Sequence, residues 1–297
     1  MKFSWRYESD YPQTVKLFLK EQHIPRKFVS FLKFSNGRML VNQQEVTVRY
    51  LLQKGDELVL EAPDEASHET VPPSFAPIEI VYEDRDVLVL NKPVDVVSIP
   101  SRKAPDTAMA NRVKGYYIQQ GYSDQVIHIV TRLDRQTSGL MLIAKHRLAH
   151  ALLDQQIQAK GIEKIYYAIS SRNDWQPHGV IEAPIARCGE SIITRQVHES
   201  GQYARTEYWL EQSFHDSSLL RLQLHTGRTH QIRVHLTHEG GVLVGDDLYG
   251  GRLEAPIMRQ ALHCGELKFR QPFTQEVIHL HQALPEDMAT WVAQRTK

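Results

Sequence analysis

A single carboxylate lies between two guanidinium groups in the segment TRLDRQTSGLMLIAK, residues 131–145. Arg132 precedes Asp134 by two residues, Arg135 follows it directly, and an apolar run begins after a small polar turn. Cationic neighbours favour the ionised form of a carboxylate, and arginine is well suited to grip phosphate. The segment therefore predicts an ionised nucleophile or base beside a polyanion-binding frame, or else a charged turn that caps a strand.

A second cationic segment, LLRLQLHTGRTHQIRVHLTHEGGVLVGDDLYGG, covers residues 219–251. It has the pattern of a strand, a turn and a helix, with Arg228 after Thr226-Gly227 at the expected helix N-terminus. Backbone N–H groups at such a position bind phosphate. We therefore predict that Arg228 binds an anionic substrate, and we interpret Asp246 in VGDDLYG as a structural turn residue.

The histidines of this segment could in principle ligate a metal, which would indicate a metal hydrolase. A zincin helix needs a glutamate after the first histidine and the second histidine four residues on. Here Gln231 follows His230, and His235 comes five residues later. We therefore expect no metal site.

The segment EKIYYAIS is typical of a strand, in which Lys164, Tyr166 and Ala168 share one face. Tyr166 could be a core aromatic with a satisfied hydroxyl, or it could stack on an unpaired nucleobase. In the second case Lys164 would contact the same substrate.

Several other chemistries lack their motifs. The chain has no phosphate-binding P-loop, no dinucleotide fingerprint and no nucleophile elbow, so we expect no nucleotide cofactor. The two cysteines, Cys188 and Cys264, are far apart, which fits a reducing, cytoplasmic compartment. No apolar run approaches the ~20 residues that a bilayer crossing needs. The 35 basic and 35 acidic residues balance, so only the distribution of charge could indicate nucleic acid.

A proline-rich stretch, APDEASHETVPPSFAP, predicts a linker over residues 62–77. It separates a small domain, residues 1–61, from a large domain, residues 78–297. The small domain is expected to be α/β, with two amphipathic helices before its strands, and a strand at Met39 to Val41 after the Asn36-Gly37 turn.

The large domain shows more strands than helices, and its strands follow one another in meanders. We predict an α+β fold: a mostly antiparallel mixed sheet flanked by a few helices. One of these helices is HRLAHALLDQQIQAKG, for which Gly161 is the expected C-cap.

Residues 12–61 resemble the alpha-L RNA-binding domain, through PRKFVSFLKFSNGRMLVN and the closing KGDELVL. The resemblance implies that Arg26, Lys27, Lys33 and Arg38 face a folded RNA. Phosphate contacts of this kind give affinity without sequence choice. A solvated charged face would show the same residues.

Residues 78–285 resemble the RluA-type pseudouridine synthases, which isomerise chosen uridines in ribosomal or transfer RNA. RLDRQTSGL, KIYYA and TGRTHQIRVHL…VGDDLYG occur in the order and rough spacing of that family. The resemblance implies a cofactor-free isomerase that acts on RNA. We expect ribosomal RNA, large subunit preferred, as the substrate and a monomer as the acting form. A catalytically inactive RNA-binding ribosome-assembly factor with the same fold is the alternative.

The resemblance also assigns residues by position. Asp134 corresponds to the family's catalytic aspartate and Tyr166 to the tyrosine that packs on the uracil ring. Arg132 corresponds to the arginine that enters the RNA where the base is flipped out. Arg233 corresponds to the arginine that pairs with the aspartate, and Ile232 lines the pocket. This chain has Thr131 where the family usually has histidine, and Asp95 where it tends to have glycine.

Overall fold

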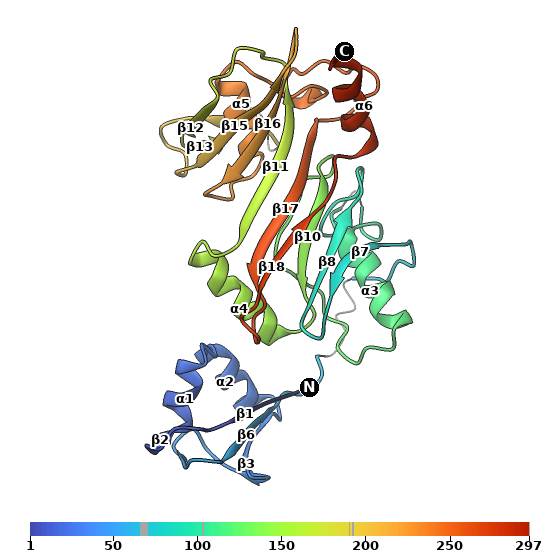
Figure 1. The fold of residues 1–297 in the computed structure, drawn as a ribbon. Helices are drawn as coiled ribbons and strands as arrows, with labels where there is room; N and C mark the ends of the chain where they lie inside the picture. The colour runs from blue at the N-terminus through green and yellow to red at the C-terminus, as the bar shows by residue number, and fades with distance from the viewer. Residues whose placement is uncertain (66–70, 103, 190, 192, 297) are drawn as a thin grey trace.

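The computed structural model describes residues 1–65, 71–102, 104–189, 191 and 193–296. Residues 66–70, part of the predicted linker, lie outside the described residues. A small N-terminal unit lies at one end of a long sheet, whose helices cover parts of its faces and edges (Figure 1).

The N-terminal unit contains a four-stranded sheet in the order β1-β6-β3-β4 and a separate β2–β5 pair. The two predicted helices and the strand at Met39 to Val41 are confirmed. The prediction that helices come first is wrong, because β1 precedes them and pairs antiparallel with β6. The elements are β1 (Lys2–Arg6), β2 (Gln13–Thr14), α1 (Val15–Glu21), α2 (Arg26–Phe34), β3 (Arg38–Val41), β4 (Gln44–Glu45), β5 (Leu51–Leu52) and β6 (Glu57–Glu61).

The N-terminal unit packs against helix α4 (Arg147–Gln158) of the large unit. Leu148 and Leu152 of α4 belong to the same buried apolar cluster as the core of the N-terminal unit. The Gln155 side-chain amide also donates a hydrogen bond to the carbonyl of His23 at 3.2 Å. Removing the N-terminal unit would therefore expose apolar surface on α4.

The segment after residue 70 also contacts the large unit. The carbonyl of Val71 accepts a hydrogen bond from the Lys114 ammonium, and the carbonyl of Pro72 accepts one from the Asn111 amide, both at 2.7 Å. This part of the chain is therefore fastened to helix α3 (Met109–Gln119).

The large unit is built on one ten-stranded sheet in the order β12-β15-β16-β11-β17-β10-β8-β7, with β18 paired to β17 and β9 to β10. Among the described strands of this sheet, β10 and β17 form the one parallel pair, so the predicted mostly antiparallel sheet is confirmed. The strands are β7 (Glu79–Glu83), β8 (Val87–Lys92), β9 (His128–Ile129), β10 (Ser138–Ala144), β11 (Glu163–Ser170), β12 (His178–Glu182), β15 (Arg205–Ser213), β16 (Ser218–Leu224), β17 (Leu262–Arg270) and β18 (Val277–His281).

The remaining elements are helices that pack on or beside the sheet and a separate two-stranded sheet, β13–β14. Helix α3 packs on β8 and β10, and α6 packs beside the end of β11, each through a buried apolar cluster. These elements are β13 (Ile185–Arg187), β14 (Arg195–Val197), α5 (Gln231–His238), the 3-10 helix η1 (Asp247–Tyr249) and α6 (Glu286–Arg295). Among the described helices, none combines the length and apolar character needed to cross a membrane.

Helix α4 ends two residues earlier than the sequence predicted. Its C-cap is Ala159, and Lys160, not Gly161, takes the left-handed conformation with φ 56°. The N–H of Gly161 donates to the carbonyl of Gln156 at 2.7 Å, and the N–H of Lys160 donates to that of Ile157 at 3.0 Å. This is the Schellman arrangement, in which glycine is preferred but not required at the left-handed position.

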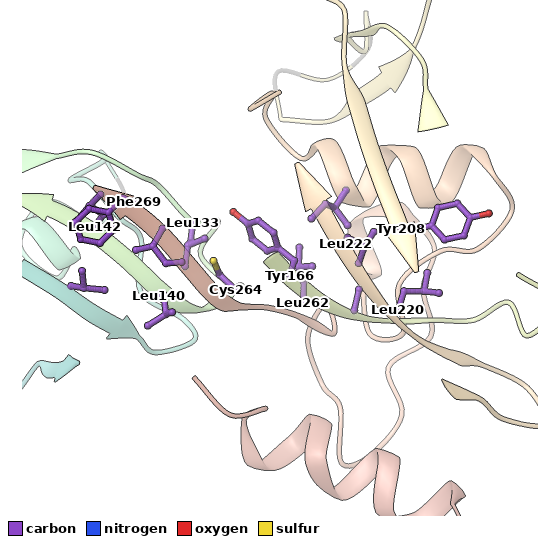
Figure 2. Close-up of a cluster of buried hydrophobic side chains, with 14 of the residues drawn as sticks. Leu133, Leu140, Leu142, Tyr166, Tyr208, Leu220, Leu222, Leu262, Cys264 and Phe269 are labelled. Atoms are coloured by element: carbon purple, nitrogen blue, oxygen red, sulfur yellow. The ribbon is translucent and has the colours of Figure 1, made fainter. Parts of the chain in front are cut away.

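The main core lies on one face of the central strands. Tyr166 of β11 and Cys264 of β17 are cross-strand partners and point to the same side of the sheet (Figure 2). Leu133, which follows β9, packs in the same cluster. The core thus reaches the loop that carries Asp134.

Candidate active site

The loop between β9 and β10 carries Asp134 and is fixed by hydrogen bonds from distant segments. The Ser98 hydroxyl accepts from the N–H of Leu133 at 3.0 Å and donates to its carbonyl at 2.8 Å. The hydroxyl of buried Thr131 accepts from the N–H of Leu142 at 2.9 Å. Since the residues before Asp134 are held at two points, its carboxylate has a defined position before any substrate binds.

Lys92, which is fully buried, fixes the same loop through hydrogen bonds of its ammonium group. The Lys92 ammonium donates to the carbonyls of Pro93 and Val96 at 2.7 Å and to that of Arg135 at 3.1 Å. Burial lowers the pKa of Lys92 to about 7, although the negative charge of Asp134 opposes this shift. Lys92 therefore ties strand β8 to the residue that follows Asp134.

A cleft of about 670 Å³ opens above this loop. The residues that line it include all seven predicted catalytic and substrate-binding positions, which come from β11, from α5 and the turn before it, and from the loop before β10. These seven are Arg132, Asp134, Lys164, Tyr166, Arg228, Ile232 and Arg233.

The basic side chains closest to the Asp134 carboxylate come from α5 and its N-cap, not from the neighbouring residues in sequence. Arg233 Nη1 lies 3.5 Å and His230 Nε2 3.8 Å from Asp134 Oδ2. Arg135 instead pairs with Asp95 at 3.2 Å on the exposed surface. The interpretation of Asp134 as bracketed by Arg132 and Arg135 is therefore corrected: Arg135 pairs with Asp95, and the ion pair of Asp134 is with Arg233 of α5.

Arg233 has a stronger partner than Asp134. Its Nε and Nη2 donate to the two carboxylate oxygens of Asp246, each at 2.7 Å, and both side chains are buried. Burial opposes the charged form of Arg233, but the hydrogen bonds and charge of Asp246 raise its pKa above the usual value. Asp246 was interpreted from the sequence only as a turn residue, so this role was not predicted. Its carboxylate neutralises the buried Arg233 guanidinium, for which Asp134 at 3.5 Å is a weaker partner.

His230 lies beside the same carboxylate in an unusual backbone conformation. It is the N-cap of α5 with φ 58°, and its Nδ1 lies 2.8 Å from the Tyr249 hydroxyl. Burial lowers the pKa of His230, and the charge of Arg233 adds to this while Asp134 opposes it. The Arg233 guanidinium lies over the Tyr249 ring at 4.8 Å, so His230, Arg233 and Tyr249 form one packed unit.

Tyr166 lies in the core at the edge of the cleft, 4% exposed. Burial raises its pKa well above the usual value, and nearby Cys264 and Asp134 raise it further. The hydroxyl therefore stays protonated near neutral pH and can donate a hydrogen bond. Burial likewise raises the pKa of the Cys264 thiol to about 12 and lowers the pKa of the Lys164 ammonium.

A family model described as RNA pseudouridylate synthase matches residues 86–238. The chain is 42% identical over 276 residues to an uncharacterized RNA pseudouridine synthase of Bacillus subtilis, YjbO, with 93% of this chain and 97% of the relative covered. The chain belongs to the RNA pseudouridylate synthase family. It is an RNA pseudouridine synthase, an isomerase, and the resemblance to the RluA-type enzymes is confirmed.

Further relatives support the same family. The synthase is 35% identical over 279 residues to the ribosomal large subunit pseudouridine synthase D of Pseudomonas aeruginosa, with 90% of this chain and 86% of the relative covered. A solved structure, human RNA pseudouridylate synthase domain containing 4, shares the fold with a TM-score of 0.61 at 20% identity, covering 73% of this chain and 93% of that one.

The two departures from the family pattern have local explanations. Asp95 has φ 62°, the left-handed region in which glycine costs least, and aspartate is among the side chains that tolerate it. Its carboxylate accepts a hydrogen bond from the Gln136 side chain at 2.9 Å. Thr131 provides the hydroxyl that fixes the loop at Leu142.

Four members of the site were not predicted from the sequence: Asp246, His230, Tyr249 and Lys92. Two signals were available in the synthase sequence: an acid that follows an apolar run in VGDDLYG, and a lysine that ends the apolar strand VLVLNK. A charged side chain inside a buried segment needs a partner. Neither signal identifies that partner.

Proposed function

We propose that the synthase converts uridines of large-subunit ribosomal RNA to pseudouridine as a cytoplasmic monomer that uses no cofactor. The position of Asp134 carries this proposal, since its carboxylate is one-third exposed in the cleft beside Arg233 and close to buried Tyr166. The choice of RNA rests on the relatives named ribosomal large subunit pseudouridine synthase D.

The reaction breaks the bond from sugar C1′ to ring N1 and forms one from C1′ to ring C5. The proton on C5 is lost and N1 gains one, so the atoms balance without a co-reactant. Asp134 would supply the carboxylate that attacks the substrate or stabilises positive charge on the sugar. Arg233, held by Asp246, would orient that carboxylate and balance its charge.

The target base must leave the RNA stack, at a cost of a few kcal/mol. Arg132 is exposed at the cleft, two residues before Asp134, and would occupy the vacated space. Tyr166 and Ile232 would contact the flipped ring from the apolar side of the cleft, and Arg228 and Lys164 would contact the RNA backbone.

Asp134→Asn tests the catalytic assignment, because it keeps the shape of the side chain and removes its charge. We expect pseudouridine formation on a large-subunit RNA transcript to be abolished, with RNA affinity within about tenfold of wild type. Retained turnover by the pure variant would remove Asp134 from the mechanism. Sequencing of chemically labelled RNA from cells with and without the gene tests the substrate, and a lost mark confined to another RNA class would contradict it.

We also propose that residues 1–61 form an RNA-docking domain, joined through the linker at 62–77 to the catalytic domain at 78–297. Arg26, Lys27 and Lys33 are exposed on α2, and the Lys33 ammonium lies 5.5 Å above the ring of Phe34, itself 77% exposed. Exposed cations beside an exposed aromatic ring suit RNA. Arg38 is the weaker candidate, because Glu61 neutralises its guanidinium.

Charge reversal in the full chain tests this domain without exposing α4. Arg26→Glu/Lys33→Glu should weaken binding to long RNA and reduce the slope of log affinity against log salt by about 2. Lys16→Glu/Lys20→Glu, on exposed positions of α1, is the matched control for the change of charge. Equal effects of both pairs would show that net charge, not the α2 surface, sets the affinity.

A further inference from the structure

A β-bulge in β17 places the Glu266 side chain on the face of the sheet opposite the active-site cleft. Glu266 pairs with Ile165 and Cys264 with Tyr166, so Gly265 has no partner on β11 and the register shifts there. Cys264 therefore shares the face of Tyr166, whereas Glu266 lies on the opposite face. There the Tyr167 hydroxyl donates to Glu266 Oε1 at 2.9 Å.

Two histidines of β18 converge on the other oxygen of this carboxylate. His279 and His281 are two residues apart on one strand, so they share a face, and His281 is the register partner of Glu266. His279 Nε2 lies 3.2 Å and His281 Nδ1 3.7 Å from Glu266 Oε2. The three possible ligand atoms lie within 4.8 Å of one another.

These separations match those of a transition-metal site. Zinc bonds of about 2.0–2.2 Å in tetrahedral geometry place ligand atoms roughly 3.4 Å apart. Two imidazoles and one carboxylate suit zinc and its neighbours in the transition series, whereas magnesium and calcium prefer oxygen ligands. Small side-chain adjustments would bring all three atoms to one ion.

Neighbouring side chains hold the carboxylate in a fixed orientation. Tyr167 and, at 3.8 Å, the Arg221 guanidinium engage Oε1, which leaves Oε2 directed at the histidines. The Glu266 side chain is only 14% exposed, whereas the histidines are exposed and leave room for a water ligand.

We propose that Glu266, His279 and His281 bind one divalent transition-metal ion of the zinc class and so brace β18 on β17. The ion would replace the present contacts between the histidines and Glu266 Oε2. The site is on the face opposite the cleft, so the proposal is independent of the catalytic assignment. A second glutamate offers a contrast: Glu207 meets His178 at Oε1 and His225 at Oε2, so these histidines do not converge on one oxygen.

The test measures Zn²⁺ affinity of the full-length protein, freed of purification tags and pre-treated with chelator, by competition with a chromophoric chelator. Wild type should bind one Zn²⁺ per chain with micromolar or tighter affinity, unaffected by excess Mg²⁺. His279→Gln/His281→Gln should lose more than about 100-fold in affinity, and Tyr167→Phe about tenfold, since partners that orient a ligand are typically worth about 10–100-fold. His178→Gln is the matched control and should bind as wild type does.

Hydrogen exchange of the β18 amides provides a second readout, in which Zn²⁺ should slow exchange in wild type and in His178→Gln but not in His279→Gln/His281→Gln. The glutamines replace exposed side chains, so folding should be retained, and circular dichroism checks this. Absence of a micromolar site in wild type, or unchanged affinity in the double variant, would overturn the proposal. Equal loss in His178→Gln would also overturn it, since binding would then be spread over surface histidines.

Discussion

Replacing Asp246 should destabilise the protein far more than replacing Asp134, although both carboxylates lie near Arg233. The Asp246 side chain is fully buried and makes two hydrogen bonds of 2.7 Å to the guanidinium. Asp134 is 33% exposed and lies 3.5 Å from it. Asp246→Ala leaves a buried guanidinium without its main counter-charge, which typically costs ~3–5 kcal/mol. Loss of an ion pair with a partly exposed carboxylate and a 3.5 Å separation costs less than ~1 kcal/mol.

A double-mutant cycle separates the two partners. Arg233→Ala strands Asp246 in the same way, so the double variant Asp246→Ala/Arg233→Ala should be more stable than the sum of the single losses predicts, by ~2–3 kcal/mol. The corresponding coupling between Asp134 and Arg233 should be below ~1 kcal/mol. Urea unfolding, followed by tryptophan fluorescence and circular dichroism, measures the free energy of unfolding of each variant. The comparison requires that the dependence of this free energy on urea concentration is the same in all variants.

Activity provides an independent check. Compared with Arg233→Ala, Arg233→Lys should recover part of the stability but little of the turnover. An ammonium cannot reproduce the bidentate hydrogen bonds of the guanidinium to Asp246. This account of the site would be refuted if the losses of unfolding free energy at Arg233 and Asp246 were strictly additive while those at Arg233 and Asp134 were strongly coupled. That result would favour instead the direct pairing with Asp134 that the sequence suggested.

Substitutions at three further residues test other parts of the site. Tyr166→Phe should retain a higher kcat/KM than Tyr166→Ala, by a factor equivalent to the ~1–3 kcal/mol that stacking on a base contributes. If both variants are equally inactive, the protonated hydroxyl and not the ring is essential. Lys92→Met should flatten the pH dependence of the free energy of unfolding: burial lowers the folded pKa to about 7, against about 10.4 in the unfolded chain. The unfolded wild type therefore binds more protons between these values, and its stability should rise with pH relative to the variant; parallel profiles from urea unfolding at pH 7, 8 and 9 would contradict this. Asp95→Ala should be less stable than Asp95→Gly by ~1 kcal/mol in thermal melts, since φ is 62° there; equal melting temperatures would show that the left-handed conformation costs nothing.

The sequence by itself indicated the family, the antiparallel sheet and seven of the residues that line the cleft. It could do so because these features depend on local patterns. Alternation of apolar residues specifies strands, and motifs such as RLDRQTSGL and HQIRVHL keep catalytic side chains at fixed spacings within one element. The exposed cations of α2 are also visible in sequence, although their role in binding RNA stays a prediction.

Only the tertiary structure decided which charges meet. Asp134 has Arg132 and Arg135 beside it in the chain, yet the basic side chains nearest to its carboxylate in space are Arg233 and His230, because α5 lies against the loop before β10. Likewise, pairing of Arg233 with Asp246 depends on how the segment after α5 folds back. Coulomb energy and desolvation depend on distance and burial in three dimensions, and neither quantity can be obtained from separation along the chain.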